Sequence, residues 1–182
     1  MRIKNSLCGP MKLALCGFMG AGKTSVFRGL SRLKQFEDFV FIDTDQVLLD
    51  DNPLHSNISE LVDLVGWRKF REDEENLIKK IARSGEDTIL SLGGGSLNER
   101  VIEQLRSNNF KLAWLKVEFE ELIRRATLST NNRPLLKEKS KAEIFKLYQE
   151  REKLYSKADI IIENESIEET LQSIDKYLFS TF

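Results

Sequence analysis

The chain has 182 residues, 41% hydrophobic and 31% charged, which is ordinary for one globular domain with a well-buried core. Its formal net charge of -1 comes without a basic block, so we expect neither nucleic acid nor a membrane surface as a partner. No apolar run approaches the roughly 18 residues of a membrane span. The two cysteines, Cys8 and Cys16, are too few for a disulfide framework. These features favour a cytoplasmic protein that binds small molecules, and we expect it to act as a monomer.

The predicted elements alternate in type along the chain. Residues 1–10 are expected to form a disordered extension, and a single domain is expected over residues 11–182. Apolar runs of strand length alternate with helical patterns in this domain, which is typical of an α/β fold with a parallel sheet between helices. The predicted strands cover residues 12–16, 39–43, 88–92, 111–117 and 159–162. The predicted helices cover about 23–33, 59–83, 97–108, 119–127, 141–157 and 167–179, with Ser59, Ser140 and Ser166 as N-caps.

Two stretches are longer than the connections between these elements require. Residues 46–83 lie between the second and third strands, and residues 128–140 precede the fifth helix. Ligand sites in open α/β folds are built at the carboxyl ends of parallel strands. We therefore expect both insertions to carry function.

Residues 17–24 read Gly-Phe-Met-Gly-Ala-Gly-Lys-Thr and follow the first predicted strand directly. They match G-x-x-x-x-G-K-[ST], a loop whose backbone N–H groups surround nucleotide phosphates at the start of a helix. Lys23 adds a cation for the phosphates, and Thr24 is placed to ligate the Mg²⁺ that bridges them. The sequence therefore predicts a site for a nucleoside triphosphate.

Two carboxylates, Asp43 and Asp45, end the second predicted strand. In an extended backbone, side chains two residues apart share a face. One acid could then serve the metal while the other orients or deprotonates an acceptor hydroxyl. The alternative is that the acids only cap a following helix. Beside a phosphate loop, the catalytic interpretation is favoured.

Two further segments supply candidate binding groups. Gly93, Gly94 and Gly95 close the third predicted strand, where they allow a substrate to approach the backbone closely or form a plain flexible turn. Arg71 lies three residues before Glu74 in the first insertion. The acid can hold this guanidinium for an oxyanion, although most such pairs are solvated surface bridges.

Two more arginines lie in the second half of the chain. Arg133, followed by Pro134, stands in the polar loop 128–140. Such a loop can close as a lid and bring Arg133 to the transferring phosphate, unless it is an ordinary surface loop in which Pro134 ends a helix. Arg151, judged from the charge pattern alone, is a solvated residue on a helix face.

The order of these motifs resembles the shikimate kinase family, a compact branch of the P-loop kinases. The resemblance extends from about residue 11 to residue 162, and its motifs are G-F-M-G-A-G-K-T at 17–24, D-x-D at 43–45, F-R-x-x-E at 70–74, L-G-G-G at 92–95, R-P-L-L at 133–136 and, more weakly, R-x-x-L-Y at 151–155. It implies a three-layer P-loop fold with a five-stranded parallel sheet, a shikimate-binding helical insertion at 46–83 and a lid at 128–140. The implied activity is ATP-dependent phosphorylation of the 3-hydroxyl of shikimate to 3-phosphoshikimate, a step of aromatic amino-acid biosynthesis.

The same resemblance implies roles for individual residues. ATP would be bound by Gly20, Ala21, Gly22, Lys23, Thr24, Ser25 and Arg133, and Mg²⁺ by Thr24 and, through water, Asp43. Shikimate would be bound by Asp45, Arg71, Gly93, Gly94, Gly95 and Arg151. The catalytic residues would be Lys23, Asp45 and Arg133, with Asp45 as the candidate base at the 3-hydroxyl.

The sequence departs from the family pattern in three places. The arginine that usually stacks on adenine is replaced by Ala126, and Arg125 lies one residue earlier. Lys153 stands where the segment that begins with Arg151 usually has proline. The stretch around His55, the only histidine, follows no family pattern, and we expect no catalytic role for it.

Two alternative functions stay open at this stage. One is a related small-molecule kinase of the same fold, such as a gluconate or nucleotide kinase. The other is a nucleotide-binding module without catalysis. The first would not be expected to combine these motifs in this order, and the second has no use for Asp45 at an acceptor site.

Overall fold

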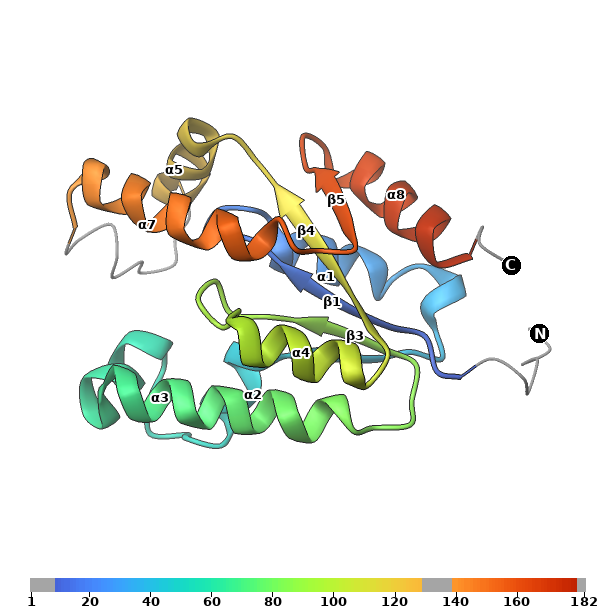
Figure 1. Cartoon of the computed structure of the whole chain (residues 1–182), viewed down its shortest axis with the longest axis horizontal. Helices are drawn as coiled ribbons and strands as arrows, with labels where there is room; N and C mark the ends of the chain where they lie inside the picture. Colours follow the sequence, from blue (N-terminus) through green and yellow to red (C-terminus); the bar gives the residue numbers. More distant parts are fainter. Residues whose placement is uncertain (1–8, 129–138, 180–182) are drawn as a thin grey trace.

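The computed structural model describes residues 9–128 and 139–179 of the chain (Figure 1). Its strands are β1 (Lys12–Cys16), β2 (Val40–Asp43), β3 (Thr88–Ser91), β4 (Phe110–Lys116) and β5 (Ile160–Glu163). They form one sheet in the order β2-β3-β1-β4-β5, and every pair of neighbours in it is parallel. The predicted five-stranded parallel sheet is confirmed, and each strand begins and ends within about one residue of its expected bounds.

The helices are α1 (Lys23–Leu30), α2 (Thr44–Asp50), α3 (Ile58–Ala82), α4 (Glu99–Ser107), α5 (Phe119–Leu128), α7 (Lys141–Tyr155) and α8 (Ile167–Phe179), with a 3₁₀ turn at Lys34–Phe36. The connection through α1 runs toward the β2 edge of the sheet, whereas the connections that lead to β3, β4 and β5 run toward the β5 edge. Because such crossovers are right-handed, α1 lies on one face of the sheet and α3, α4 and α7 lie on the other. α8 packs against α1, and α3 against α4, which gives three layers (Figure 1).

β1 is the central strand and is buried along its whole length. Its one charged residue, Lys12, lies at the amino end of the sheet, opposite the predicted site. The Lys12 ammonium donates to the carbonyls of Ala82, at 3.0 Å, and Asn108, at 3.3 Å, which end α3 and α4. A cation is favoured at helix carboxyl ends, so this burial is compensated.

No helix within residues 9–128 and 139–179 has the length and apolar content needed to span a bilayer.

The expected geometry of the two acids after β2 is wrong. The chain does not stay extended, because α2 begins at Thr44 with Asp43 as its N-cap. The Asp43 carboxylate accepts from the backbone N–H groups of Asp45, at 3.0 Å, and Gln46, at 3.3 Å. Asp45 therefore lies in the first turn of a helix, where its position depends on the Asp43 cap.

The N-cap predictions for the other helices have mixed outcomes. Ser140 caps α7 in a reciprocal capping box with Glu143, as predicted. Ser166 accepts from the N–H of the third residue of α8, at 3.2 Å, in agreement with its predicted role. Ser59 is not a cap, because α3 begins one residue earlier and Asn57 accepts from the Glu60 N–H at 3.1 Å.

The segment 46–83 holds most of α2 and all of α3, and it has a small apolar cluster of its own. Leu48 of α2 packs with Leu61, Val62 and Phe70 of α3, apart from the main core around the sheet. Within α3, Gly66 leaves helical geometry with φ 78 and ψ 152, so the helix is kinked there. Phe70 is 2% exposed. It therefore anchors the turn of α3 that follows the kink, from which Arg71 projects.

Candidate active site

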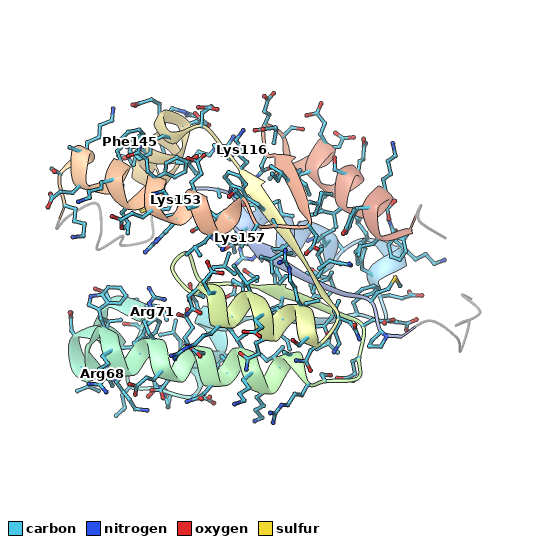
Figure 2. All side chains as sticks on the ribbon, in the orientation of Figure 1. Arg68, Arg71, Lys116, Phe145, Lys153 and Lys157 are labelled. Atoms are coloured by element: carbon cyan, nitrogen blue, oxygen red, sulfur yellow. The ribbon has the colours of Figure 1, made fainter. Side chains whose placement is uncertain are left out.

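A cavity of about 1150 Å³ opens at the carboxyl edge of the sheet, between the loops after β1, β2 and β3 and the helices α3 and α7. It collects every predicted site residue that the structure describes. These residues are Gly20, Ala21, Gly22, Lys23, Thr24, Ser25, Asp43, Asp45, Arg71, Gly93, Gly94, Gly95 and Arg151. Figure 2 shows Arg71 on the side of α3 that faces α7. Arg133 lies outside the described residues, so its role stays a prediction.

The loop after β1 has the conformation that a phosphate site requires. Gly20 and Gly22 have φ values of 79 and 81, in the left-handed region that favours glycine. A Cβ on Gly22 would lie 2.7 Å from Nδ2 of Asn164, so the position is also closed to larger residues by space. α1 begins at Lys23 and directs its positive end at the loop. The Lys23 ammonium donates to the Gly17 carbonyl at 2.7 Å, which holds the cation over the loop.

Asn164 follows β5, the edge strand, and connects the phosphate loop to that edge of the sheet. Its side-chain amide donates to the Ala21 carbonyl at 2.6 Å and accepts from the Thr170 hydroxyl at 2.7 Å. Its backbone carbonyl accepts from Arg125 at 3.0 Å. Arg125 lines the cavity, whereas Ala126 is 2% exposed in the core. Asn164 was missing from the predicted site because an asparagine after a strand carries no local signal of this contact.

Asp45 lines the cavity and has a strongly shifted pKa. Its pKa is raised to about 6, first by burial and then by the carboxylates of Asp43 and Glu74, while Lys23 and Arg71 act in the opposite direction. Asp45 is therefore mostly ionised at neutral pH but accepts a proton more readily than an ordinary aspartate. Burial and a neighbouring like charge are the usual causes of such a shift at a functional site.

Glu74 links α3 to the loop after β3. Its side chain is 2% exposed, and its two oxygens pair with the Arg71 guanidinium and with the Ser96 hydroxyl, the latter at 2.5 Å. The indole of Trp67 lies 5.2 Å from the Arg71 guanidinium and adds a cation–π contact. Arg71 and Glu74 are thus a partly buried pair at the cavity, in which only the arginine reaches solvent, and not a solvated surface bridge. Neither Ser96 nor Trp67 was predicted. Ser96 meets Glu74 only because the fold brings them together, and the contact of Trp67 with Arg71 is a ring contact that belongs to no motif.

Arg151 is not the solvated residue that its charge pattern indicates. Its guanidinium lies 5.3 Å above the ring of Phe18 in the phosphate loop. A Cβ on Gly95 would touch the Arg71 guanidinium and lie 2.8 Å from Nη2 of Arg151, so both arginines converge on Gly95. Burial lowers the pKa of Arg151, and the nearby Arg71 charge acts in the same direction. A carboxylate between the two guanidiniums would relieve this repulsion and match their planar donors.

The donor groups at this edge also fit Mg²⁺. The Thr24 hydroxyl and the Asp43 carboxylate both line the cavity, and both are the hard oxygen ligands that Mg²⁺ prefers. In the part of the chain that the structure describes, no group of three or more His, Cys, Asp or Glu side chains could hold a metal ion.

Comparison with known proteins gives a consistent assignment. A family model described as shikimate kinase matches residues 19–180. A shikimate kinase of Moorella thermoacetica is 34% identical over 159 residues, which are 87% of this chain and 88% of that protein. One of Bacillus subtilis is 32% identical over 164 residues, 89% of this chain and 86% of that protein.

Solved structures agree with the sequence relatives. The crystal structure of shikimate kinase from Bacteroides thetaiotaomicron has a TM-score of 0.78 and 28% identity, and the match covers 92% of this chain and 98% of that one. A gluconokinase from Sinorhizobium meliloti, with a TM-score of 0.55, 13% identity and 90% and 88% coverage, shares the fold alone. The family model spans most of the chain and includes Lys23, the two acids, the F-R-x-x-E segment and the triple glycine. The chain therefore belongs to the shikimate kinase family.

Proposed function

We propose that this enzyme transfers the γ-phosphoryl group of ATP to the 3-hydroxyl of shikimate, giving 3-phosphoshikimate and ADP in the pathway to chorismate and the aromatic amino acids. The observation that carries the proposal is that the phosphate loop, a carboxylate with a raised pKa and two converging arginines line one cavity. A phosphoryl donor, a proton acceptor and a carboxylate clamp are what the phosphorylation of an acidic polyol requires.

Shikimate is a ring that carries one carboxylate and three hydroxyls. The cavity offers arginines for the carboxylate and an acid for a hydroxyl. The carboxylate would lie between Arg71 and Arg151, near the backbone of Gly95. The ring would rest against the triple glycine, with a hydroxyl directed at Asp45. A Cβ on Gly93 would lie 2.7 Å from Oδ1 of Asp45, so the acid is held next to this wall. The clamp thereby fixes which hydroxyl meets Asp45.

The chemical step then follows from position and charge. The 3-hydroxyl oxygen attacks the γ-phosphorus as its proton passes to the Asp45 carboxylate, and the bond from the γ-phosphorus to the bridging oxygen breaks to release ADP. Lys23 and the loop amides stabilise the charge on the phosphate oxygens. Thr24 and Asp43 would hold Mg²⁺, which neutralises charge on the β- and γ-phosphates when bound. Arg133 is proposed, on the family resemblance, to reach the transferring group from the lid.

An assay of coupled ADP release, with shikimate, gluconate and nucleoside monophosphates offered in turn, tests the proposal. Turnover that depends on shikimate supports it. Turnover only with gluconate or a nucleotide would point to a related kinase of the same fold. Nucleotide binding without turnover on any acceptor would point to a non-catalytic module.

We further propose that the enzyme acts in the cytoplasm as a monomer. Cys16, a free cysteine of the described chain, is 1% exposed, and burial raises the pKa of its thiol to about 12. Such a thiol is suited to a reducing compartment as a small core residue. Sedimentation at assay concentrations tests the monomer, and a dimer would contradict it.

A further inference from the structure

We propose that Tyr155 is a positioning residue for the acceptor: its hydroxyl locks the Gly94–Gly95 peptide and supports Arg151, so that both address the shikimate carboxylate. The inference rests on the proposed function. It assigns a task to a buried side chain that has no contact with the cavity and takes no part in the chemistry described above.

Tyr155 is the last residue of α7 and is 2% exposed. Its ring lies 5.9 Å from that of Trp114, under the carboxyl edge of β4. Its hydroxyl donates to the Gly94 carbonyl at 2.6 Å. Burial raises the pKa of this phenol, so it stays neutral and keeps its single proton on the bond to Gly94. The Arg151 guanidinium, one turn earlier on α7, interacts electrostatically with this phenol, which presents only its lone pairs to the cation.

The bond to Gly94 fixes more than one atom. The carbonyl of Gly94 and the N–H of Gly95 belong to one peptide unit, and in a trans peptide they point in opposite directions. No cis peptide bond is present among the described residues. Because the carbonyl is directed at buried Tyr155, the Gly95 N–H is directed to the other side, where Gly95 lines the cavity between Arg71 and Arg151.

This peptide needs such a lock because glycines flank it. Three consecutive glycines have few steric limits on φ and ψ, so the peptide plane could otherwise rotate and withdraw its donor. Within residues 9–128 and 139–179, the amides of Gly94 and Gly95 have no acceptor in the protein. A donor held in this way beside two guanidiniums is suited to one oxygen of a carboxylate.

Tyr155 also influences Arg151, whose guanidinium lies beside the same two glycines. This guanidinium lies 5.3 Å above the ring of Phe18 and interacts electrostatically with the Tyr155 hydroxyl, and a Cβ on Gly94 would lie 3.9 Å from its Nη1. Tyr155 thus acts on both groups that would meet the acceptor, through a hydrogen bond to Gly94 and an electrostatic interaction with Arg151, and neither interaction involves a nucleotide-binding residue. A loss of the hydroxyl should therefore weaken shikimate and spare ATP.

The test is steady-state kinetics of Tyr155→Phe, which removes the hydroxyl and keeps the ring packed on Trp114. We expect the KM for shikimate to rise about tenfold, the size of one hydrogen bond to a charged group. The KM for ATP should stay within about twofold and kcat within about threefold. Tyr148→Phe is the matched control, because it removes a phenol from the same helix whose hydroxyl bonds to Glu152 at 3.2 Å, away from the triple glycine. It should behave as the unmodified enzyme.

Three results would overturn the inference: an unchanged KM for shikimate in Tyr155→Phe, an equal rise in both KM values, or the same effect in Tyr148→Phe. The second would mean that the hydroxyl serves the fold as a whole. Failure of the unmodified enzyme to phosphorylate shikimate would instead refute the proposed function, so the two failures are distinguishable.

A measurement on the unmodified enzyme keeps the inference testable if the variant does not fold. In protein labelled with ¹⁵N-glycine, shikimate should shift the assigned Gly95 amide proton downfield by more than the Gly85 amide, which lies in open surroundings. An unmoved Gly95 amide in the presence of bound shikimate would overturn the inference.

Discussion

Gly93→Ala tests directly whether the acid and the clamp meet at the triple glycine. An added Cβ would lie 2.7 Å from three oxygens at once: Oδ1 of Asp45, Oε1 of Glu74 and Oγ of Ser96. Ordinary contact begins at 3.4 Å, so each oxygen would have to retreat by about 0.7 Å. A shift of about 1 Å in a reacting group costs about a hundredfold in rate. We therefore expect kcat with shikimate to fall by roughly ten- to a hundredfold.

The assay is coupled ADP release at saturating ATP, with the KM for ATP measured alongside. The phosphate loop is not displaced by the added methyl group, so that KM should stay within about twofold. Gly85→Ala is the matched control, since nothing lies within 4 Å of its Cβ position and its backbone is not left-handed. A Gly93→Ala enzyme with wild-type kcat would refute the reasoning, because it would mean that Asp45 and Glu74 can move without cost.

Three further predictions concern the acid and the clamp. Asp45→Asn should lower kcat by roughly 10²–10⁴ while the KM for ATP stays nearly unchanged, because an amide cannot take the proton; an unchanged kcat would remove Asp45 from the mechanism. Arg71→Lys should raise the KM for shikimate about tenfold more than that for ATP, since an ammonium cannot replace the guanidinium fork, and equal losses would make the arginine structural. In a pH profile, kcat/KM should fall as pH drops through about 6, because the raised pKa of Asp45 places its protonation there. Asp43→Asn, which keeps the N-cap but removes a charge that raises this pKa, should move the acid limb to lower pH, and a limb that stays in place would contradict the assigned cause.

The sheet could be predicted because its signals are local. β1 is a short apolar run followed by a glycine-rich loop, and the other strands repeat the pattern with turn residues or helices between them. The phosphate loop is local as well, since G-x-x-x-x-G-K-[ST] between a strand and a helix has few other uses. Parallel pairing then brings the ends of β1, β2 and β3 to one edge, and Asp43, Ser91 and Leu15 share one row of the sheet. Placing the site at that edge needed no knowledge of strand order.

α2 is the element that the sequence analysis missed, and the reason is its length. Its span, Thr44–Asp50, is seven residues, too short for a helical period to stand out beside a strand. Two tertiary contacts stabilise its start: the Thr44 hydroxyl donates to the Ser91 carbonyl at 3.3 Å and accepts from the Gly93 N–H at 3.0 Å. The predicted site survived this error because a helix that begins at the sheet edge leaves Asp45 in the same cavity as an extended chain would.

The contacts that set the site's geometry join residues far apart in sequence. Ser96 pairs with Glu74 over 22 positions, Tyr155 with Gly94 over 61, and Asn164 with Ala21 over 143. Each uses a common side chain whose task depends on what the fold brings opposite it, so no spacing rule could reveal it. Motifs predict which groups touch the ligands. The residues behind them, which orient these groups through hydrogen bonds, can be identified only from the structure.

The site joins groups at the sheet edge to groups on α3. The phosphate loop and the triple glycine end strands of the main core, whereas Arg71 lies in the part of α3 packed by the small cluster around Phe70; the end of α3, with Ile78 and Ala82, joins the main core. A small cluster buries less apolar surface, so the part of α3 around Arg71 depends more on its polar contacts with the sheet edge. Glu74 makes that contact, because one of its oxygens pairs with Arg71 and the other with Ser96. The same carboxylate raises the pKa of Asp45, so the group that docks α3 at the sheet edge also tunes the proposed base.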